Sequence, residues 1–197
     1  MNWKAALHPV LNRGSAKTDF LDEMTLFVKD APESLFAHNQ ADDIYAACSA
    51  ELGPWLTILA RKAAMLTCLS VLSLFESSQK WSEGADTTNP SEDNPDTMSA
   101  GPFQLAYNSR SFGSDLRTMI TEAGIKNGDE FQNAMKTNRP FTFEYTIRLV
   151  RITRKHNGPL YKGHERSAFH GAQQQQDHSI YPWLRRDAMA EFAANLA

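Results

Sequence analysis

One apolar run in the first half of the chain constrains the fold more than any other feature. The segment AAMLTCLSVLSLF, residues 63–75, is apolar on nearly all sides, contains no Gly or Pro, and follows Arg61 and Lys62. It falls short of the roughly 20 apolar residues that a membrane-spanning helix needs. The sequence therefore predicts no membrane span here but a buried helix at the centre of the protein, beginning at Pro54 and ending near Ser77.

Shorter amphipathic patterns on both sides of this run predict further helices. They cover residues 18–31, 41–52, 114–125, 129–136, 140–156 and 182–196. Two segments between them, 82–99 and 157–181, are expected to be irregular loops. A chain of 197 residues is long enough for one well-buried core. We therefore expect one compact, mainly α-helical domain, in which residues 1–50 pack on or precede a core formed by residues 51–197.

Composition argues against several classes of function. The net charge of -3 gives no electrostatic support for nucleic-acid binding. Cys48 and Cys68 are too few for a disulfide framework and have no zinc or redox spacing, although one bond between them is possible. The N-terminus has no continuous apolar segment and no small-residue cleavage site, so we expect no cleavable secretory signal.

The sequence predicts neither a metal site nor a cofactor. His164 and His170 are six residues apart, whereas a helical zinc motif places two histidines at i and i+4. The loop after Trp81 contains five carboxylates without the alternation of an EF-hand, which favours a solvated loop over a calcium site. These carboxylates are Glu83, Asp86, Glu92, Asp93 and Asp96.

Glu76 directly follows the apolar run and is the first candidate catalytic residue. At the C-terminal end of a helix the macrodipole disfavours a carboxylate, and apolar neighbours exclude water from it. Both effects favour the neutral carboxyl group that a general acid requires. The alternative is a glutamate that reaches solvent at a helix end, and these residues alone do not decide between the two.

Three short motifs occur in a fixed order around this glutamate. Glu76-Ser77 ends the predicted central helix, Gly101-x-x-Gln104 follows a long loop, and Asn157-Gly158 follows the helix predicted at 140–156. In this order the chain resembles the lysozyme-like superfamily, especially goose-type lysozymes and lytic transglycosylases, over about residues 55–165. The resemblance implies a lysozyme-like fold with a central buried helix and a small β-hairpin or loop lobe flanking a cleft.

The resemblance also implies an activity and a set of site residues. The expected reaction is cleavage of the peptidoglycan glycan strand at the β-1,4 bond between N-acetylmuramic acid and N-acetylglucosamine. Glu76 would protonate the glycosidic oxygen. Tyr145 fits packing as well as it fits contact with the glycan. The implied substrate-binding residues are Ser77, Gln104, Tyr107, Asn108, Tyr145 and Asn157.

The step after protonation depends on a second group. An inverting hydrolase uses a second carboxylate to activate water, and Asp86 is the candidate for this base, with Glu83 and Asp96 as alternatives. Lytic transglycosylases instead use the 6-hydroxyl of the substrate and form an anhydro sugar. A chitinase- or chitosanase-like hydrolase and a catalytically silent glycan-binding module also fit the sequence.

Such an activity implies a location and a partner. The substrate lies in the cell wall or periplasm, so the protein is expected to be exported without a cleaved signal or released by lysis, as phage lysins and antibacterial secretion effectors are. A cell that produces a toxin of this kind is expected to contain a cognate inhibitor, an expectation that rests on analogy.

Overall fold

The computed structural model of the chain describes residues 1–37, 43–85, 90, 92–156, 158–165 and 178–197. The protein is mainly α-helical, as the sequence predicts. Its longer helices are α1 (Thr18–Asp30), α4 (Ile58–Ser77), α5 (Ser114–Glu122), α6 (Gly128–Thr137), α7 (Arg139–Ile152), α8 (Gly158–Glu165) and α10 (Arg186–Leu196). Short elements are α2 (Ile44–Ala47), α3 (Ser49–Leu52) and the 3-10 turns η1 (Glu33–Phe36), η2 (Tyr107–Phe112) and η4 (Tyr181–Trp183).

Helix α4 is the central element, and its apolar run is buried as predicted. Every residue from 63 to 75 is buried, and α4 contacts α1, α2, α8 and α10. Within the described part of the chain, α4 alone is long and apolar enough to cross a membrane, but 72% of its most apolar window is buried inside the protein. It is therefore the core helix of this fold.

The start of α4 differs from the prediction. The helix begins at Ile58 and not at Pro54, because Thr57 caps it: the Thr57 side chain accepts a hydrogen bond from the Ala60 amide at 3.1 Å. Such a side-chain acceptor satisfies an amide that has no partner within the helix. Residues 54–57 therefore precede the helix, and Thr57 is its N-terminal cap.

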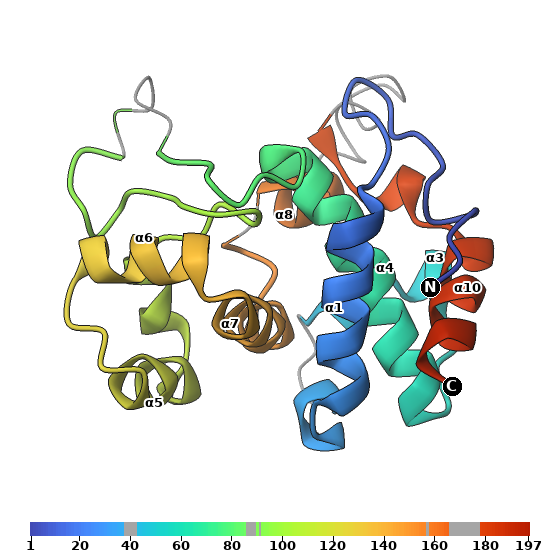
Figure 1. The fold of residues 1–197 in the computed structure, drawn as a ribbon. Helices are drawn as coiled ribbons and strands as arrows, with labels where there is room; N and C mark the ends of the chain where they lie inside the picture. The colour runs from blue at the N-terminus through green and yellow to red at the C-terminus, as the bar shows by residue number, and fades with distance from the viewer. Residues whose placement is uncertain (38–42, 86–89, 91, 157, 166–177) are drawn as a thin grey trace.

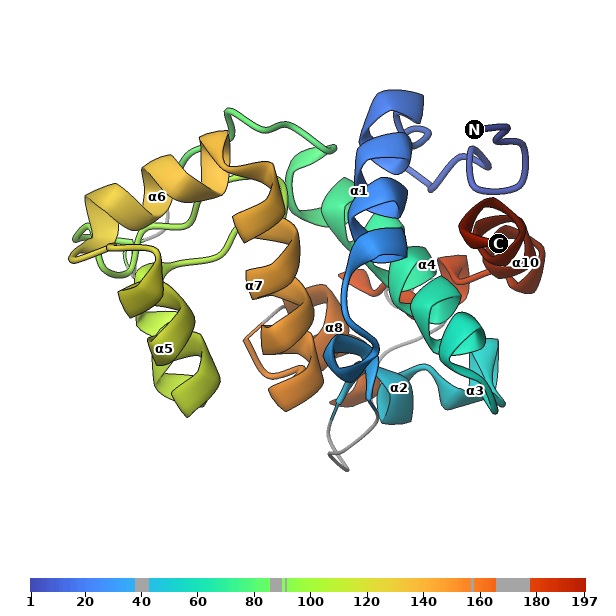
Figure 2. The same cartoon turned by 60° about the horizontal axis from the view of Figure 1, so that its bottom comes forward.

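The helices form two groups with α7 between them (Figures 1 and 2). Helices α1, α4 and α10 lie side by side in one group, and α5 and α6 form the other. Helix α1 belongs to the core, because Phe20, Leu21 and Met24 on its inner face are at most 2% exposed. The N-terminal segment is thus an integral part of the buried interior and does not simply precede it.

Two further predictions about helices need correction. Residues 44–52 form two short helices that meet at Cys48, not the single helix predicted at 41–52. Residues 158–165 form α8, although the segment 157–181 was expected to be irregular. Leu160 explains why α8 forms. Its side chain is fully buried and gives α8 an apolar contact with the core, which no periodic pattern in the sequence predicts.

Strand structure is minimal among the described residues. It consists of two isolated antiparallel bridges, Val10 with Gly14 and Ala100 with Leu105. The described residues of the segment 82–99 contain neither helix nor strand, in agreement with the predicted loop. At Gly101–Gln104 the structure has a tight turn closed by the second bridge.

Candidate functional site

The candidate site is built around the last turn of α4. Glu76 is the first partly exposed position after thirteen consecutive buried residues. The helix ends where Ser78, with φ 54°, enters the left-handed conformation, and the Ser78 amide donates to the Leu74 carbonyl. Glu76 therefore occupies a boundary position, with the apolar core on one side and solvent on the other.

Ser77 connects the end of α4 directly to the Gly-x-x-Gln motif. Its buried hydroxyl donates to the Pro102 carbonyl at 2.9 Å and accepts from the Lys80 amide at 3.1 Å. Two motifs that are 25 residues apart in the sequence are thus in contact through one hydrogen bond. The fold brings Ser77 and the turn at Gly101–Gln104 together.

Hydrogen bonds within the segment hold Gly101–Gln104 in a tight turn. Ala100 and Leu105 exchange backbone hydrogen bonds, and the Gln104 side-chain amide donates to the Gly101 carbonyl at 2.9 Å. Gly101 has φ +72°, and a Cβ atom at this position would lie 2.6 Å from the Met135 carbonyl oxygen. Glycine is therefore required here both by the left-handed conformation and by the close approach of α6.

Backbone strain is concentrated beside Glu76. Among the described residues, four that are not glycine have positive φ: Asn12, Ser78, Gln79 and Gln104. Three of the four lie in the chain reversal after α4 or in the turn that contacts it. Such conformations cost on the order of 1–3 kcal/mol each and are frequent at functional sites.

Gln79 is a residue of this site that sequence reasoning missed. Its side chain is 2% exposed, accepts from the Lys17 amide at 2.7 Å, and donates to the Ser73 hydroxyl at 3.1 Å. The Lys17 ammonium group in turn donates to the Gln79 carbonyl at 3.0 Å. The segment before α1 is thereby tied to the end of α4. The available signal was a polar amide next to an apolar helix, which is too common to be specific.

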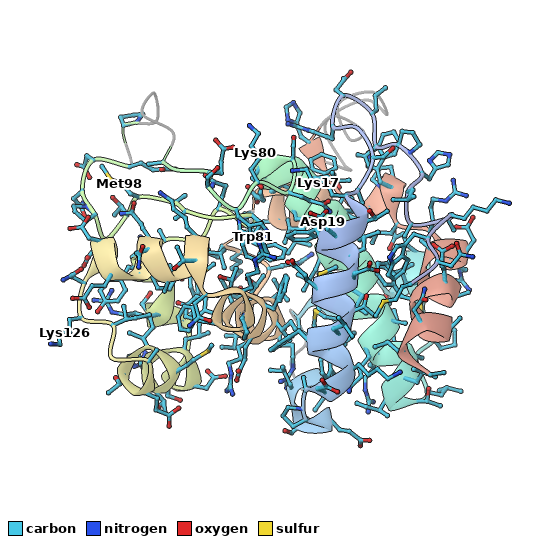
Figure 3. The ribbon with its side chains drawn as sticks, in the orientation of Figure 1. Lys17, Asp19, Lys80, Trp81, Met98 and Lys126 are labelled. Atoms are coloured by element: carbon cyan, nitrogen blue, oxygen red, sulfur yellow. The ribbon has the colours of Figure 1, made fainter. Side chains whose placement is uncertain are left out.

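Trp81 covers an aromatic cluster next to the chain reversal. Its ring centre lies 5.5 Å from those of both Phe20 and Phe143, and the Arg139 guanidinium lies 5.0 Å from the ring centre. Figure 3 shows Trp81 below Lys80, between α6 and the upper part of α1. The cluster joins α1, α7 and the loop after α4, so Trp81 has a clear packing role.

The three predicted contacts near η2 have different environments. Asn108 is exposed, and the Tyr107 ring is 7% exposed with the Arg110 guanidinium stacked 3.6 Å from its centre. Tyr145 is fully buried, its hydroxyl lies 2.8 Å from the Ser109 hydroxyl, and burial raises its pKa to about 12. Tyr145 is thus a packing residue that exposes no surface to a ligand in this conformation.

The two described alternatives for the second carboxylate, Glu83 and Asp96, each make contacts of their own. Glu83 forms an ion pair with Lys80 at 3.1 Å. Asp96 accepts from the Gly128 amide at 3.2 Å through its carboxylate, at the start of α6, and from the Asn108 amide through its carbonyl. Asp86 and Asn157 lie outside the described residues. The two described acids are therefore engaged in structural contacts.

Potential metal ligands are not clustered in the described part of the chain, where no three of His, Cys, Asp and Glu come together. His170 and the side chain of His164 lie outside the described residues. In the acidic loop, the Glu92 carboxylate accepts from both the amide and the hydroxyl of Ser99 at 3.1 Å. This carboxylate thus has a local structural role.

Two cavities lined by described residues lie beside α7, and Glu76 is not among the residues that line them. One, of about 540 Å³, lies between α1 and α7 and is lined by apolar residues such as Leu26, Phe27 and Phe143. The other, of about 690 Å³, lies between α5 and α7 and is more polar. The region around Glu76 is described by the hydrogen bonds of Ser77, Gln79 and Gln104.

Comparisons with known protein families, with curated proteins and with solved structures find no significant match.

Proposed function

We propose that this protein cleaves the glycan strand of peptidoglycan as a muramidase, with Glu76 as the general acid. The observation that carries the proposal is the hydrogen bond from the Ser77 hydroxyl to the Pro102 carbonyl. This bond joins the Glu-Ser and Gly-x-x-Gln motifs in space. Two short motifs that occur in this order only by chance would not be expected to lie in contact. The concentration of left-handed residues at the same place adds support.

The position of Glu76 suits proton donation to a glycosidic oxygen. A carboxyl group next to the buried end of α4 is partly shielded from water, while its partial exposure leaves it accessible to a ligand. Partial exclusion of water favours the neutral form of a carboxyl group, and that form carries the proton to be transferred. The oxygen of the leaving sugar accepts the proton as the glycosidic bond breaks.

A lytic transglycosylase reaction is the second candidate, and a specific observation favours it. Glu83 is paired with Lys80, and Asp96 accepts a hydrogen bond at the start of α6, so both carboxylates already have partners of their own. A route with one glutamate uses the 6-hydroxyl of the substrate as the nucleophile and needs no second carboxylate. Asp86 remains the candidate base for the hydrolytic route.

Clearing of purified peptidoglycan suspensions tests the role of Glu76. We expect Glu76→Gln to lower the clearing rate by roughly 10²–10⁴-fold, the usual contribution of a general acid. Glu33→Gln is the matched control, because Glu33 is an exposed glutamate of η1, outside the candidate site. Equal clearing by Glu76→Gln and wild type would refute the assignment. Binding of glycan without clearing by the wild type would indicate a silent glycan-binding module.

Mass spectrometry of the released fragments separates the two reactions. Hydrolysis gives reducing ends, whereas the intramolecular reaction gives anhydro ends. Chitin and chitosan oligomers, assayed in parallel, test the alternative that the cleft accepts glycans without lactyl and peptide groups.

The proposed substrate implies where the protein acts and what could inhibit it. Peptidoglycan lies in the cell wall, so the site of action is the wall or the periplasm. A producing cell exposed to this activity needs protection, and a cognate inhibitor that covers Glu76 is the expected partner. This expectation follows from the chemistry of the substrate and from analogy with other wall-degrading toxins.

A further inference from the structure

The two cysteines of the chain lie next to each other in the core. Cys48 stands at the junction of α2 and α3, and Cys68 lies in the middle of α4. Their Sγ atoms are 3.2 Å apart, and the residues are 1% and 0% exposed. Both are free thiols in this structure.

Two features indicate that this pair is close to the geometry of a disulfide. The Sγ–Sγ separation of 3.2 Å is about 1 Å longer than an S–S bond of roughly 2.05 Å. The two elements that carry the sulfurs are also in direct contact, since α2 packs on α4. The fold therefore places the two sulfur atoms side by side.

We propose that Cys48 and Cys68 form a disulfide bond when the chain folds under oxidising conditions. The two thiols lose two protons and two electrons as the S–S bond forms. An external disulfide, such as oxidised glutathione or the active-site disulfide of a thiol oxidoreductase, accepts the electrons and is reduced to two thiols. The proposal concerns a modification site and does not depend on the proposed cleavage of peptidoglycan.

Burial determines when this bond forms. Thiol–disulfide exchange requires a thiolate that an external disulfide can reach. The hydrogen bond with Cys68, together with burial, raises the pKa of the Cys48 thiol well above its usual value. Reaction in the folded protein is therefore slow, and the bond forms before or while α2 docks on α4. Once formed, it is shielded from reductants for the same reason.

The bond would stabilise the contact between α2 and α4. It closes a loop between positions 20 residues apart, which includes α3 and the capped start of α4. A loop of this length restricts the unfolded chain enough to raise the melting temperature by roughly 5–10 °C in a protein of this size. This gain is measurable by comparing the oxidised and reduced forms of the same chain.

Thiol counting after refolding tests the proposal. The full chain is reduced and unfolded, then refolded either in a mixture of oxidised and reduced glutathione or in dithiothreitol. Thiols are labelled with a maleimide after renewed denaturation. We expect no labelled cysteine and a monomer lighter by two hydrogen atoms after the glutathione refolding, and two labelled cysteines after the dithiothreitol refolding.

Two free thiols after the glutathione refolding would overturn the proposal, as would a disulfide-linked dimer on a non-reducing gel. Cys48→Ser and Cys68→Ser are the matched variants, and each should lose the difference in melting temperature between oxidised and reduced samples. If a serine variant does not fold, the thiol count of the wild type still decides the question. Because the readout is chemical, its result is independent of any clearing assay.

Discussion

Replacement of Gly101 by alanine tests whether the turn beside Glu76 is built as closely as the structure indicates. A Cβ atom there would lie 2.6 Å from the Met135 carbonyl oxygen and 3.1 Å from the carbonyl carbon. That oxygen accepts a hydrogen bond from the Thr142 hydroxyl at 3.0 Å, which restricts its movement. Ordinary contact begins at 3.4 Å, so the turn and α6 must separate by several tenths of an ångström.

Gly124→Ala is the matched control for this substitution. Gly124 has the same φ of +72°, but a Cβ atom there would meet nothing within 4 Å. Both variants carry the conformational cost of an alanine in the left-handed region, about 1–2 kcal/mol. Only Gly101→Ala adds the steric overlap. Overlap of this kind typically costs about 1–3 kcal/mol, and the middle of that range, about 2 kcal/mol, is used for the expected loss. The difference between the variants therefore isolates the contact with α6.

Urea unfolding followed by circular dichroism measures both variants. We expect Gly101→Ala to lose about 3–4 kcal/mol of unfolding free energy and Gly124→Ala about 1–2 kcal/mol. The corresponding difference in melting temperature is roughly 4–8 °C for a protein of this size. Equal losses in the two variants would show that Gly101 is not in close contact with α6. Clearing of peptidoglycan at a temperature where both are folded should be slower for Gly101→Ala, because Pro102 is displaced from Ser77.

Two further predictions concern a hydrogen bond and a histidine. Ser77→Ala removes the hydrogen bonds that a buried hydroxyl makes with the Pro102 and Ser73 carbonyls and the Lys80 amide, so we expect a loss of about 2 kcal/mol. Ser49→Ala, which removes an exposed hydroxyl, should change the unfolding free energy little, and an equal loss in both variants would contradict the role assigned to Ser77. Burial lowers the pKa of His156 to about 4, so the unfolded chain binds more protons than the folded one between about pH 6.5 and pH 4. The unfolding free energy should therefore fall as pH decreases through this window, by at most about 3 kcal/mol. His156→Gln should remove this part of the pH dependence. If the curves of unfolding free energy against pH are parallel for the variant and wild type, the role assigned to His156 is wrong.

The sequence indicates some parts of the candidate site but not their assembly. The Glu76-Ser77 and Gly101-x-x-Gln104 motifs are visible as short patterns, and the burial of the preceding helix follows from its composition. The hydrogen bond between Ser77 and Pro102 and the contact between Gln79 and Lys17 are not visible, because they join segments far apart in the chain. Neither the residue types nor their spacing encode these pairings.

Local patterns determined most of the helices, whereas helix boundaries depended on particular contacts. Residues 63–75 could only be buried, because their apolar surface continues around the whole helix. Thr57 fixed the start of α4 through its side-chain acceptor, and Leu160 stabilises α8 through its burial. Helix propensity and periodicity predict neither interaction. Several residues near Thr57 could have capped α4, and the burial of Leu160 is a contact with distant parts of the chain.

The sequence by itself thus determined a helical protein around one apolar helix whose last turn carries Glu76. Only the tertiary structure decided what surrounds that end: a strained chain reversal, the turn at Gly101, and the segment before α1 tied to Gln79. It also assigned Tyr145 to the core and placed Cys48 next to Cys68. The physical reason is that burial of apolar surface is encoded locally, whereas the partners of polar groups are set by the packing of the whole chain.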